Sequence, residues 1–561
     1  MTRNLIRSAA LVAALGLTAC ERSLEVTNPN SGDSKKVLAT ATDAENLVGG
    51  YFKRWSTGLY GSLTVIEGMT GVMSMMNFSS LANNCLNARL PFAGANNDNT
   101  PGNVCTGEQF RIYTIENEVQ RVASTFLAQV EAGLDLQSTA RKSRDQAFAE
   151  FLRGMAIGHI AMFYDSTAIV TTKTDPQDAG TLVSYKEAGD SAMAAFQRAI
   201  DYASAPVTGS EGFPIPITWI PTPTALSQAE FIKVVRSYRA RVRANIARTP
   251  AERAAVNWAS VIADAQGGIT ADMQITTGSV TGIGNSWRAQ YDGAGLWHQM
   301  PPFVIGMADV SGSYATWQAT AIGARGSGNN GFFMVTPDLR FPQGATRAAQ
   351  QADFSITSCA ASGTVCKRYF VNRPGGNDQF AGAGWGWSNY DIARFHPWRV
   401  AGDAGSAQTG NTIYFAKAEL DMLQAEGLIR TGNAAGAATL INVTRVKNGL
   451  PAITDPTAVV PGGADCVPKV PIGPAFTAVG CGSLLEAMKY EKRLETAFIA
   501  VGPWYLDGRG WGDLAAGTPL FWATPVEDLL ARSKPTSAIY GTGGGVGMAP
   551  NSVAPKGTYG W

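Results

Sequence analysis

The apolar residues of this chain follow a helical period along two long stretches, and the period is missing from the part between them. Residues 145–164 show it clearly, because five residues recur there at steps of three and four and so share one helix face. They are Phe148, Leu152, Met155, His159 and Met162. Between about Gly267 and Thr412 the period gives way to Gly, Asn and Trp. The pattern predicts a mostly α-helical scaffold interrupted by one long irregular segment.

The periodic stretches divide into helices that come in pairs. Helices are expected at residues 185–202, 227–248, 251–265 and 414–429, and another from Asn433 to just before Pro451. Pro250 suits the first turn of the helix 251–265, and Asn433 is a good N-cap. Helix pairs with small residues at their crossings are typical of tetratricopeptide repeats. The irregular spacing indicates degenerate, tetratricopeptide-like pairs split by insertions.

Two irregular segments are long enough to suggest a function. A segment of this length without regular structure is uncommon unless it binds something. Within the middle of the chain, the runs 331–336 and 367–372 have a β-like composition and predict a few short strands. Residues 77–106 form a second irregular segment, rich in Asn, with Cys85 and Cys105 near its ends.

The charge balance excludes one class of partner. Lys and Arg number 45 and Asp and Glu 44, so the chain lacks the cationic surplus that binds nucleic acid. Hydrophobic residues make up 45% of the chain, enough for a folded core. The chain has three histidines, which leaves little for metal chemistry, and we expect no cofactor and no metal.

The N-terminal residues are typical of a lipoprotein signal peptide. Arg3 and Arg7 precede the apolar run 9–17, which is too short to span a bilayer and is typical of a signal peptide. Residues 17–20 (Leu-Thr-Ala-Cys) resemble the lipobox of bacterial lipoproteins. We expect residues 1–19 to be removed and Cys20 to carry the lipid; an ordinary cleavable signal is the alternative.

The other six cysteines form three neighbouring pairs in loop-like sequence. An oxidising envelope would let them close as disulfides. Six cysteines allow 15 pairings, of which the local ones cost the least loop-closure entropy. The predicted disulfides are Cys85–Cys105, Cys359–Cys366 and Cys466–Cys481.

Three common catalytic motifs are absent from the sequence. The sequence has no G-x-S-x-G, no H-E-x-x-H and no phosphate-binding P-loop. His159 lies on an apolar helix face and is expected to form a hydrogen bond between helices. A pair of carboxylates for glycoside hydrolysis exists in any chain of this size, so the sequence leaves that alternative open.

Aromatic residues gather in the irregular middle. Trp and Tyr faces can stack on sugar rings, whereas burial beneath loops is the other common role of Trp. One group comprises Trp287, Tyr291, Trp297, Tyr314 and Trp317, and the other Trp385, Trp387, Tyr390 and Trp398. Some of these rings are therefore expected to form a ligand platform and the rest to be structural.

Three stretches resemble the SusD/RagB family of outer-membrane lipoproteins. Residues 24–30 (Leu-Glu-Val-Thr-Asn-Pro-Asn) are similar to the family's mature N-terminus. Residues 419–451 resemble its helix pair ending in N-x-x-R…G-L-P, here Asn442, Arg445 and 449–451. Residues 491–498 (Glu-Lys-Arg-Leu-Glu-Thr-Ala-Phe) resemble its E-R-R-x-E-L-A-F helix, although Ile-Ala-Val at 499–501 replaces its E-G-H.

The resemblance implies an architecture and a role. Residues 20–561 would form a single SusD-like domain, with helix pairs at about 37–266 and 412–515 and a loop-rich ligand-binding region at about 267–411. The protein would be anchored by lipid to the bacterial outer membrane, exposed at the cell surface, and would bind ligand without performing chemistry. It would deliver an oligosaccharide, or a peptide, to a TonB-dependent transporter of the SusC type. A lipid-anchored carbohydrate-active hydrolase and a purely structural envelope protein are the alternatives.

The resemblance also places the ligand between the two irregular segments. The expected ligand-binding residues are Phe78, Asn83, Asn84, Arg89, Trp287, Trp297 and Trp317. Glu491, Arg493 and Glu495 are expected to be structural, because 491 and 495 share one helix face.

Overall fold

The computed structural model describes most of the chain after residue 39. The described ranges are 40–60, 66–79, 99, 106–175, 178–208, 212–278, 281–283, 298–321, 324–325, 332–358, 366–374, 388–397, 409–499, 502–534 and 553–561. The predicted signal peptide and Cys20 lie outside them. Among the helices of the described ranges, none combines the length and the hydropathy that a membrane span requires.

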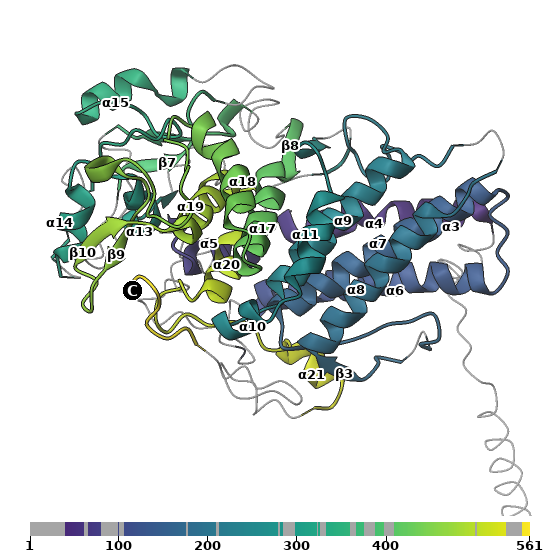
Figure 1. The fold of residues 1–561 in the computed structure, drawn as a ribbon. Coiled ribbons are helices and arrows are strands. Elements are labelled where there is room, and N and C mark those ends of the chain that lie inside the picture. Colours follow the sequence, from purple (N-terminus) through teal and green to yellow (C-terminus); the bar gives the residue numbers. More distant parts are fainter. Residues whose placement is uncertain are drawn as a thin grey trace, which may run out of the picture.

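A bundle of helices that pack in chain order forms one half of the molecule (Figure 1). α6 packs on α7, α7 on α8, α8 on α9, and α9 on α11. The helices of the chain up to residue 266 are α3 (Ala41–Gly49), α4 (Tyr51–Tyr60), α5 (Ile66–Met73), α6 (Thr106–Glu131), α7 (Thr139–Phe163), α8 (Tyr185–Ser204), α9 (Gln228–Asn245), α10 (Pro250–Ala254) and α11 (Trp258–Gln266). Of these, α5 lies at the edge of the bundle, beside α20 (Pro503–Trp511), as Figure 1 shows.

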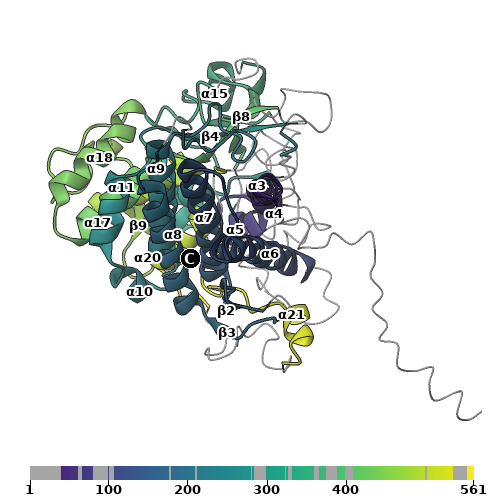
Figure 2. The ribbon, with the colours of Figure 1, turned by 90° about the vertical axis from the view of Figure 1, so that its right-hand side faces the viewer.

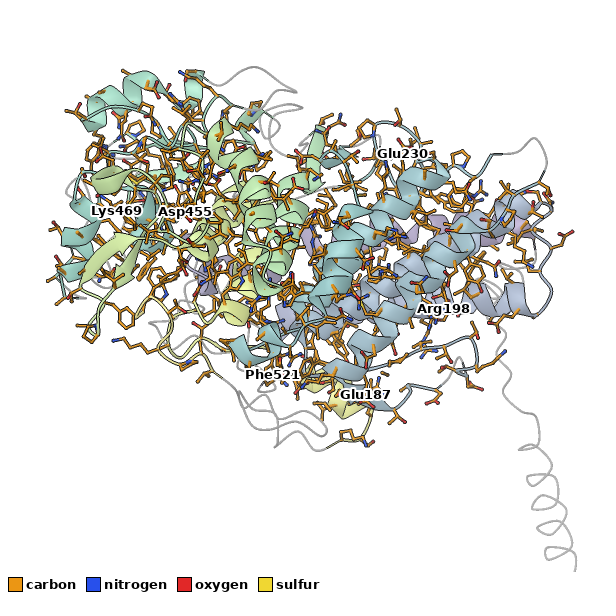
Figure 3. All side chains as sticks on the ribbon, in the orientation of Figure 1. Glu187, Arg198, Glu230, Asp455, Lys469 and Phe521 are labelled. Carbon is orange, nitrogen blue, oxygen red and sulfur yellow. A yellow bond between two sulfur atoms is a disulfide. The ribbon has the colours of Figure 1, made fainter. Side chains whose placement is uncertain are left out.

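Local sequence fixes where several of these helices begin and how closely they approach. Ser184 and Ser227 each form a capping box, with Glu187 and Glu230 respectively. These two glutamates lie at opposite ends of the bundle, as expected for antiparallel neighbours (Figure 3). A Cβ on Gly154 would come within 2.7 Å of the Phe196 ring, so glycine allows α7 and α8 to cross closely.

The second set of helices continues the same stack. α17 packs on α9 and α11 and also on α18 and α19, and Figure 2 shows α17 and α18 beside α9 and α11. These helices are α17 (Lys417–Arg430), α18 (Ala434–Lys447), α19 (Leu484–Thr496), α20 (Pro503–Trp511) and α21 (Val526–Ala531). α11 and α17 are thus neighbours in space although the whole irregular middle separates them in sequence.

A short antiparallel ladder joins the two ends of that middle segment. β4 (Met273–Thr277) pairs with β8 (Gly410–Phe415), with Gln274 opposite Ile413 and Thr277 opposite Gly410. The segment therefore leaves the helical stack and returns to it at one place.

Four more two-stranded antiparallel sheets occur in the described residues. They pair β1 (Phe78–Ser79) with β5 (His298–Gln299), β2 (Ser166–Ala168) with β3 (Leu182–Ser184), β6 (Phe370–Asn372) with β7 (Tyr390–Ile392), and β9 (Lys469–Ile472) with β10 (Ala478–Cys481). The short helices are α13 (Pro302–Ile305), η4 (Gly306–Ala308), α14 (Ser313–Ala319), α15 (Arg347–Asp353), η6 (Ile356–Ser358) and η7 (Gly463–Asp465). The predicted fold class, mostly α with a few short strands, is confirmed.

Three predictions of local structure need correction. The stretch 251–265 is two helices, because the chain turns after α10 and Asn257 caps α11 anew. The helix predicted from 414 begins at Lys417, since Tyr414 and Phe415 belong to β8. Within the run 331–336, the described residues form no strand and make one isolated bridge, from Phe332 to Ser388. The N-cap at Asn433 and the position of Pro250 in the first turn of its helix are confirmed.

Buried ion pairs attach the irregular middle to α19. The guanidinium of Arg340 lies 2.7 Å from Asp338, 2.9 Å from Glu491 and 3.4 Å from Glu495, and Arg340 and Glu491 are fully buried. Tyr369 donates a hydrogen bond to Glu495 (2.9 Å). These contacts anchor the loops of the middle to a scaffold helix.

Other polar side chains hold helices together. Arg493 forms a buried ion pair with Asp513 (2.8 Å). The predicted interhelix hydrogen bond of His159 is confirmed, since its Nδ1 lies 2.8 Å from Glu116 Oε1 on α6. Each of these contacts joins elements that are separate in sequence, so they stabilise tertiary rather than local structure.

One of the three predicted disulfides lies wholly within the described residues. Cys466 and Cys481 are bonded and close the β9–β10 hairpin, which confirms that pair. Cys366 is buried and disulfide-bonded, but its expected partner Cys359 lies outside the described residues. Cys85 and Cys105 also lie outside them.

Candidate functional site

A solvent-open hollow of about 560 Å³ lies beside α14, at the end of the molecule away from α3 and α6 (Figure 1). Aromatic rings, hydroxyl groups and one guanidinium line it. The lining residues are Ser311, Gly312, Ser313, Thr316, Trp317, Thr320, Ala324, Arg325, Phe332 and Phe333. All of them belong to the irregular middle of the chain.

The turn before α14 is organised by the buried carboxylate of Asp309. Its Oδ1 accepts hydrogen bonds from the backbone N–H (3.0 Å) and hydroxyl (2.6 Å) of Ser311 and from the N–H of Val335 (3.2 Å). Its Oδ2 accepts from the N–H of Tyr314 (2.9 Å). Gly312 adopts a left-handed φ of 90°, which a residue with a Cβ rarely does. Asp309 therefore shapes this turn and is fully engaged in doing so.

Packing holds α14 against the core. A Cβ on Gly306 would come within 2.3 Å of the Tyr314 ring, so glycine permits this ring to bury. The Tyr314 hydroxyl donates to the carbonyl of Phe303 (2.8 Å). On another side α14 packs on β10, the strand that the Cys466–Cys481 disulfide closes. The helix beside the hollow is thus held by a buried ring and by a hairpin that a disulfide closes.

Trp317 lines the hollow but is almost completely covered. The residue is 7% exposed, and its ring meets Tyr314 in a parallel arrangement (5.9 Å between ring centroids) and Phe303 edge-on (4.9 Å). The guanidinium carbon of Arg325 lies 3.7 Å from the centroid of the Trp317 ring. The structure therefore places Arg325, rather than open space, over this ring. The indole Nε1 is buried without a hydrogen-bond partner.

Arg325 is the cation of the hollow. Its Nε donates to the carbonyl of Thr320 (3.1 Å). Within the described part of the chain it forms no ion pair with a carboxylate. Partial burial lowers the pKa of Arg325 to about 10, and nearby Tyr314 opposes that shift.

Every hydroxyl on the rim has its proton directed back into the protein. Ser311 donates to Asp309, so the proton between Ser311 and Ser313 (2.9 Å) comes from Ser313. Thr316 donates to the carbonyl of Gly312 (3.1 Å) and Thr320 to that of Thr316 (2.7 Å). The free positions on these oxygens are therefore acceptors.

Two of the seven predicted ligand-binding residues, Phe78 and Trp317, lie within the described ranges. Trp317 lines the hollow. The backbone of Phe78 pairs with Gln299 in the β1–β5 ladder, which brings the two irregular segments together. The residues outside the described ranges are Asn83, Asn84, Arg89, Trp287 and Trp297.

The second aromatic group is described at one residue, Tyr390. That tyrosine is buried, and its hydroxyl lies 2.8 Å from Gln350 Oε1 and 3.1 Å from the Met334 carbonyl. It therefore has a structural role beneath the loops.

The sequence interpretation overlooked Arg325 and the rim hydroxyls. One signal was present, because Arg325 is the single charged residue between Asp309 and Asp338. A cation so isolated in sequence has no local carboxylate to pair with. Among the described residues no cluster of three or more His, Cys, Asp or Glu could hold a metal ion.

Comparison with known proteins identifies the fold. No protein-family model matches this chain, and no curated protein sequence does either. Solved structures do match over most of its length. A SusD superfamily protein from Bacteroides fragilis is 14% identical, with a TM-score of 0.52, and the match covers 88% of this chain and 98% of that one.

Two further structures agree. A SusD superfamily protein from Bacteroides vulgatus is 12% identical with a TM-score of 0.51, over 85% of this chain and 89% of that one. A SusD homolog from Bacteroides thetaiotaomicron is 14% identical with a TM-score of 0.50, over 84% and 86%. At these identities the likeness establishes the fold: the chain has a SusD-like fold, as its sequence motifs predicted.

Proposed function

We propose that this protein is a surface-exposed lipoprotein that captures oligosaccharides, or peptides, and delivers them to a TonB-dependent outer-membrane transporter of the SusC type. The observation that carries the proposal is an open hollow lined by aromatic rings, hydroxyl groups and one guanidinium, built on a SusD-like fold. Apolar rings with a few placed polar groups are the usual lining of a small-ligand site. The motifs at residues 24–30, 442–451 and 491–498 support the same role.

The described lining favours binding over hydrolysis. A glycosidase needs two carboxyl groups on either side of the scissile bond. None of the described residues that line the hollow is an Asp or a Glu. Asp309, which lies behind the rim, already accepts four hydrogen bonds. A non-catalytic binding protein is the function that these residues support.

Calorimetry with product analysis tests binding against turnover. The protein from residue 21 onward is titrated with a panel of oligosaccharides and peptides, and each mixture is then analysed for cleavage. We expect binding of at least one ligand with no cleavage. Cleavage of a glycosidic bond would instead establish the hydrolase, and binding of no ligand would overturn the proposal.

Membrane attachment and the transporter partner are tested in cells. Full-length tagged protein is expected in the outer-membrane fraction, and a β-barrel transporter should co-purify with it. Cys20→Ala should release the protein from the membrane, whereas the control Ser23→Ala should not. Membrane retention of the Cys20 variant would contradict lipid anchoring.

A further inference from the structure

We propose that the hollow beside α14 selects anionic saccharides, with Arg325 as the counter-charge for a carboxylate or sulfate group on the sugar. This inference rests on the proposed function and narrows it to a ligand class. The shared chemistry is a polyhydroxylated ring that carries a fixed negative charge, from either a uronic acid or a sulfate ester.

The first support is that the charge of Arg325 is uncompensated. Several buried arginines of the described structure face a carboxylate: Arg241 lies 2.7 Å from Glu419 and Arg253 lies 2.6 Å from Glu426. Two others, Arg248 and Arg509, form no such pair with the described residues, and each donates to two backbone carbonyls instead. Arg325 donates to one carbonyl. Arg325 lines an open hollow, and no carboxylate of the described residues forms an ion pair with it. Withdrawing a charge from water costs free energy unless an opposite charge is supplied. A bound anion would supply it.

The second support is that contacts within the protein fix the orientation of the Arg325 guanidinium. Its central carbon lies 3.7 Å from the centroid of the Trp317 ring, and its Nε donates to the Thr320 carbonyl. The terminal amino groups make no hydrogen bond with the described residues and remain for a ligand. A guanidinium presents its donors in a rigid fork that matches a planar carboxylate or a sulfate. Because protein contacts already orient this fork, little side-chain freedom is lost on binding.

The third support comes from the rim. The hydroxyl protons of Ser313 and Thr316 are directed into the protein, so these oxygens offer acceptors to a ligand, whereas the Ser311 oxygen already accepts from Ser313. A ligand that fits must therefore bring donors to the rim and an anion to Arg325. A sugar acid has both, since its ring hydroxyls donate and its acidic group accepts. An acidic peptide brings fewer donors per residue, so a saccharide is the better match.

The direct test uses the unaltered protein. Binding of trigalacturonic acid is compared by calorimetry with binding of its methyl ester, which keeps the rings and removes the charge. A sulfated galactose trisaccharide and its desulfated form make the second arm, which distinguishes the two sources of charge. We expect the charged member of at least one pair to bind about tenfold or more tightly than its neutral form.

Variants locate the effect at the hollow. Arg325→Gln should remove that preference, and Arg325→Lys should keep part of it because the charge remains. Arg532→Gln is the matched control, because Arg532 also lines a surface hollow but is paired with Asp528 (2.7 Å). The control should leave the preference unchanged. Thermal unfolding of each variant verifies that it is folded.

Distinct outcomes separate this inference from the proposed function. If neutral and charged forms bind equally well, the inference is wrong and the proposed function stands. If the preference persists in folded Arg325→Gln, the anion binds elsewhere and the inference is again wrong. If triglutamate binds more tightly than either anionic sugar, the ligand is a peptide. If no saccharide of any kind binds, both the inference and the oligosaccharide form of the proposed function fail.

Discussion

One arginine lies at the junction between α19 and the irregular middle, and another lines the hollow beside α14. The two differ in the charged groups that they face. At the junction Arg340 is fully buried and faces Asp338, Glu491 and Glu495. At the hollow Arg325 is half-buried, rests on Trp317 and faces no carboxylate of the described residues. The first charge is balanced internally and serves stability. The second has no such balance within the described residues, so its charge is available to a ligand.

Removing the junction arginine should have the largest effect on stability. Arg340→Ala leaves Asp338 and Glu491 buried without their cation, and the free energy of unfolding should fall by about 3–5 kcal/mol. Urea denaturation measures this loss. The control Arg54→Ala breaks an exposed pair with Glu118 and should cost less than about 1 kcal/mol. Equal losses in the two variants would mean that burial of the Arg340 ion pairs adds nothing to their contribution to stability.

Replacing Arg493 should have the second largest effect on stability. It is buried and pairs with one carboxylate, Asp513, so Arg493→Ala should lower the free energy of unfolding by about 3 kcal/mol. Differential scanning calorimetry should show a lower Tm, and Arg493→Lys should recover part of it. Unchanged stability together with lost ligand binding would assign Arg493 to a binding site instead.

The pairing of Glu426 with Arg253 predicts a pH dependence. Burial alone would raise the pKa of Glu426, but the guanidinium of Arg253 lowers it to about 2, against an ordinary value of 4.5. The stability that this ionised carboxylate supplies is therefore complete above pH 4.5 and is lost as the pH falls through about 2.

Glu426→Gln provides the measurement. At pH 7 it should be less stable than the unaltered protein by about 2–3 kcal/mol. This difference should shrink as the pH is lowered from 4.5 toward 2, as followed by thermal unfolding. Glu187→Gln, at an exposed capping box, should show a much smaller difference at every pH. A constant difference for Glu426→Gln would mean that Arg253 does not lower this pKa.

The disulfide next to the hollow should contribute a little less. Replacing both Cys466 and Cys481 by alanine opens a loop of 15 residues, for which chain entropy predicts a loss of about 2–3 kcal/mol. Because β10 packs on α14, we also expect weaker ligand binding in the variant. Chemical denaturation and calorimetry measure the two effects. Unaltered binding would show that the hairpin does not support the hollow.

Arg325→Gln should have the smallest effect on stability. Its cation is partly desolvated and unpaired, so a neutral side chain should change the free energy of unfolding by less than about 1 kcal/mol, in either direction. Its effect should appear in ligand binding. A loss of stability comparable with that of Arg340→Ala would mean that Arg325 has a structural partner and would contradict the comparison.

The sequence predicted the helices well because their signals are local. Ser184 with Glu187, and Pro250 in the first turn of its helix, act within four residues of themselves. The same local rules explain the errors, since Asn257 begins a new helix in a stretch that otherwise keeps its period. The SusD-like fold was predicted from three motifs in a fixed order, and the two that fall within the described residues lie on or beside α18 and α19.

The site was harder to predict because its chemistry depends on distant contacts. Arg340 has Asp338 two residues away and Arg325 has no carboxylate near it in sequence, but nothing local says that Arg340 also pairs with Glu491, 151 residues away. Trp317 was identified from its ring, but the cation above it required the fold. The partners of the rim hydroxyls are only two to four residues away in sequence, but assigning them required the turn at Gly312 and the helix α14 to be known.

The ladder between β4 and β8 has a consequence for how this chain can vary. Because the two ends of the middle segment are joined by this ladder, loops between residues 278 and 409 can lengthen or shorten while the helices on either side keep their contacts, provided that Arg340 and its pairing with α19 are kept. The entropy of closing such a loop grows only with the logarithm of its length, so a large insertion costs little more than a small one. Recognition of a new ligand can therefore be acquired by changing loops of the middle segment, without redesign of the helical scaffold.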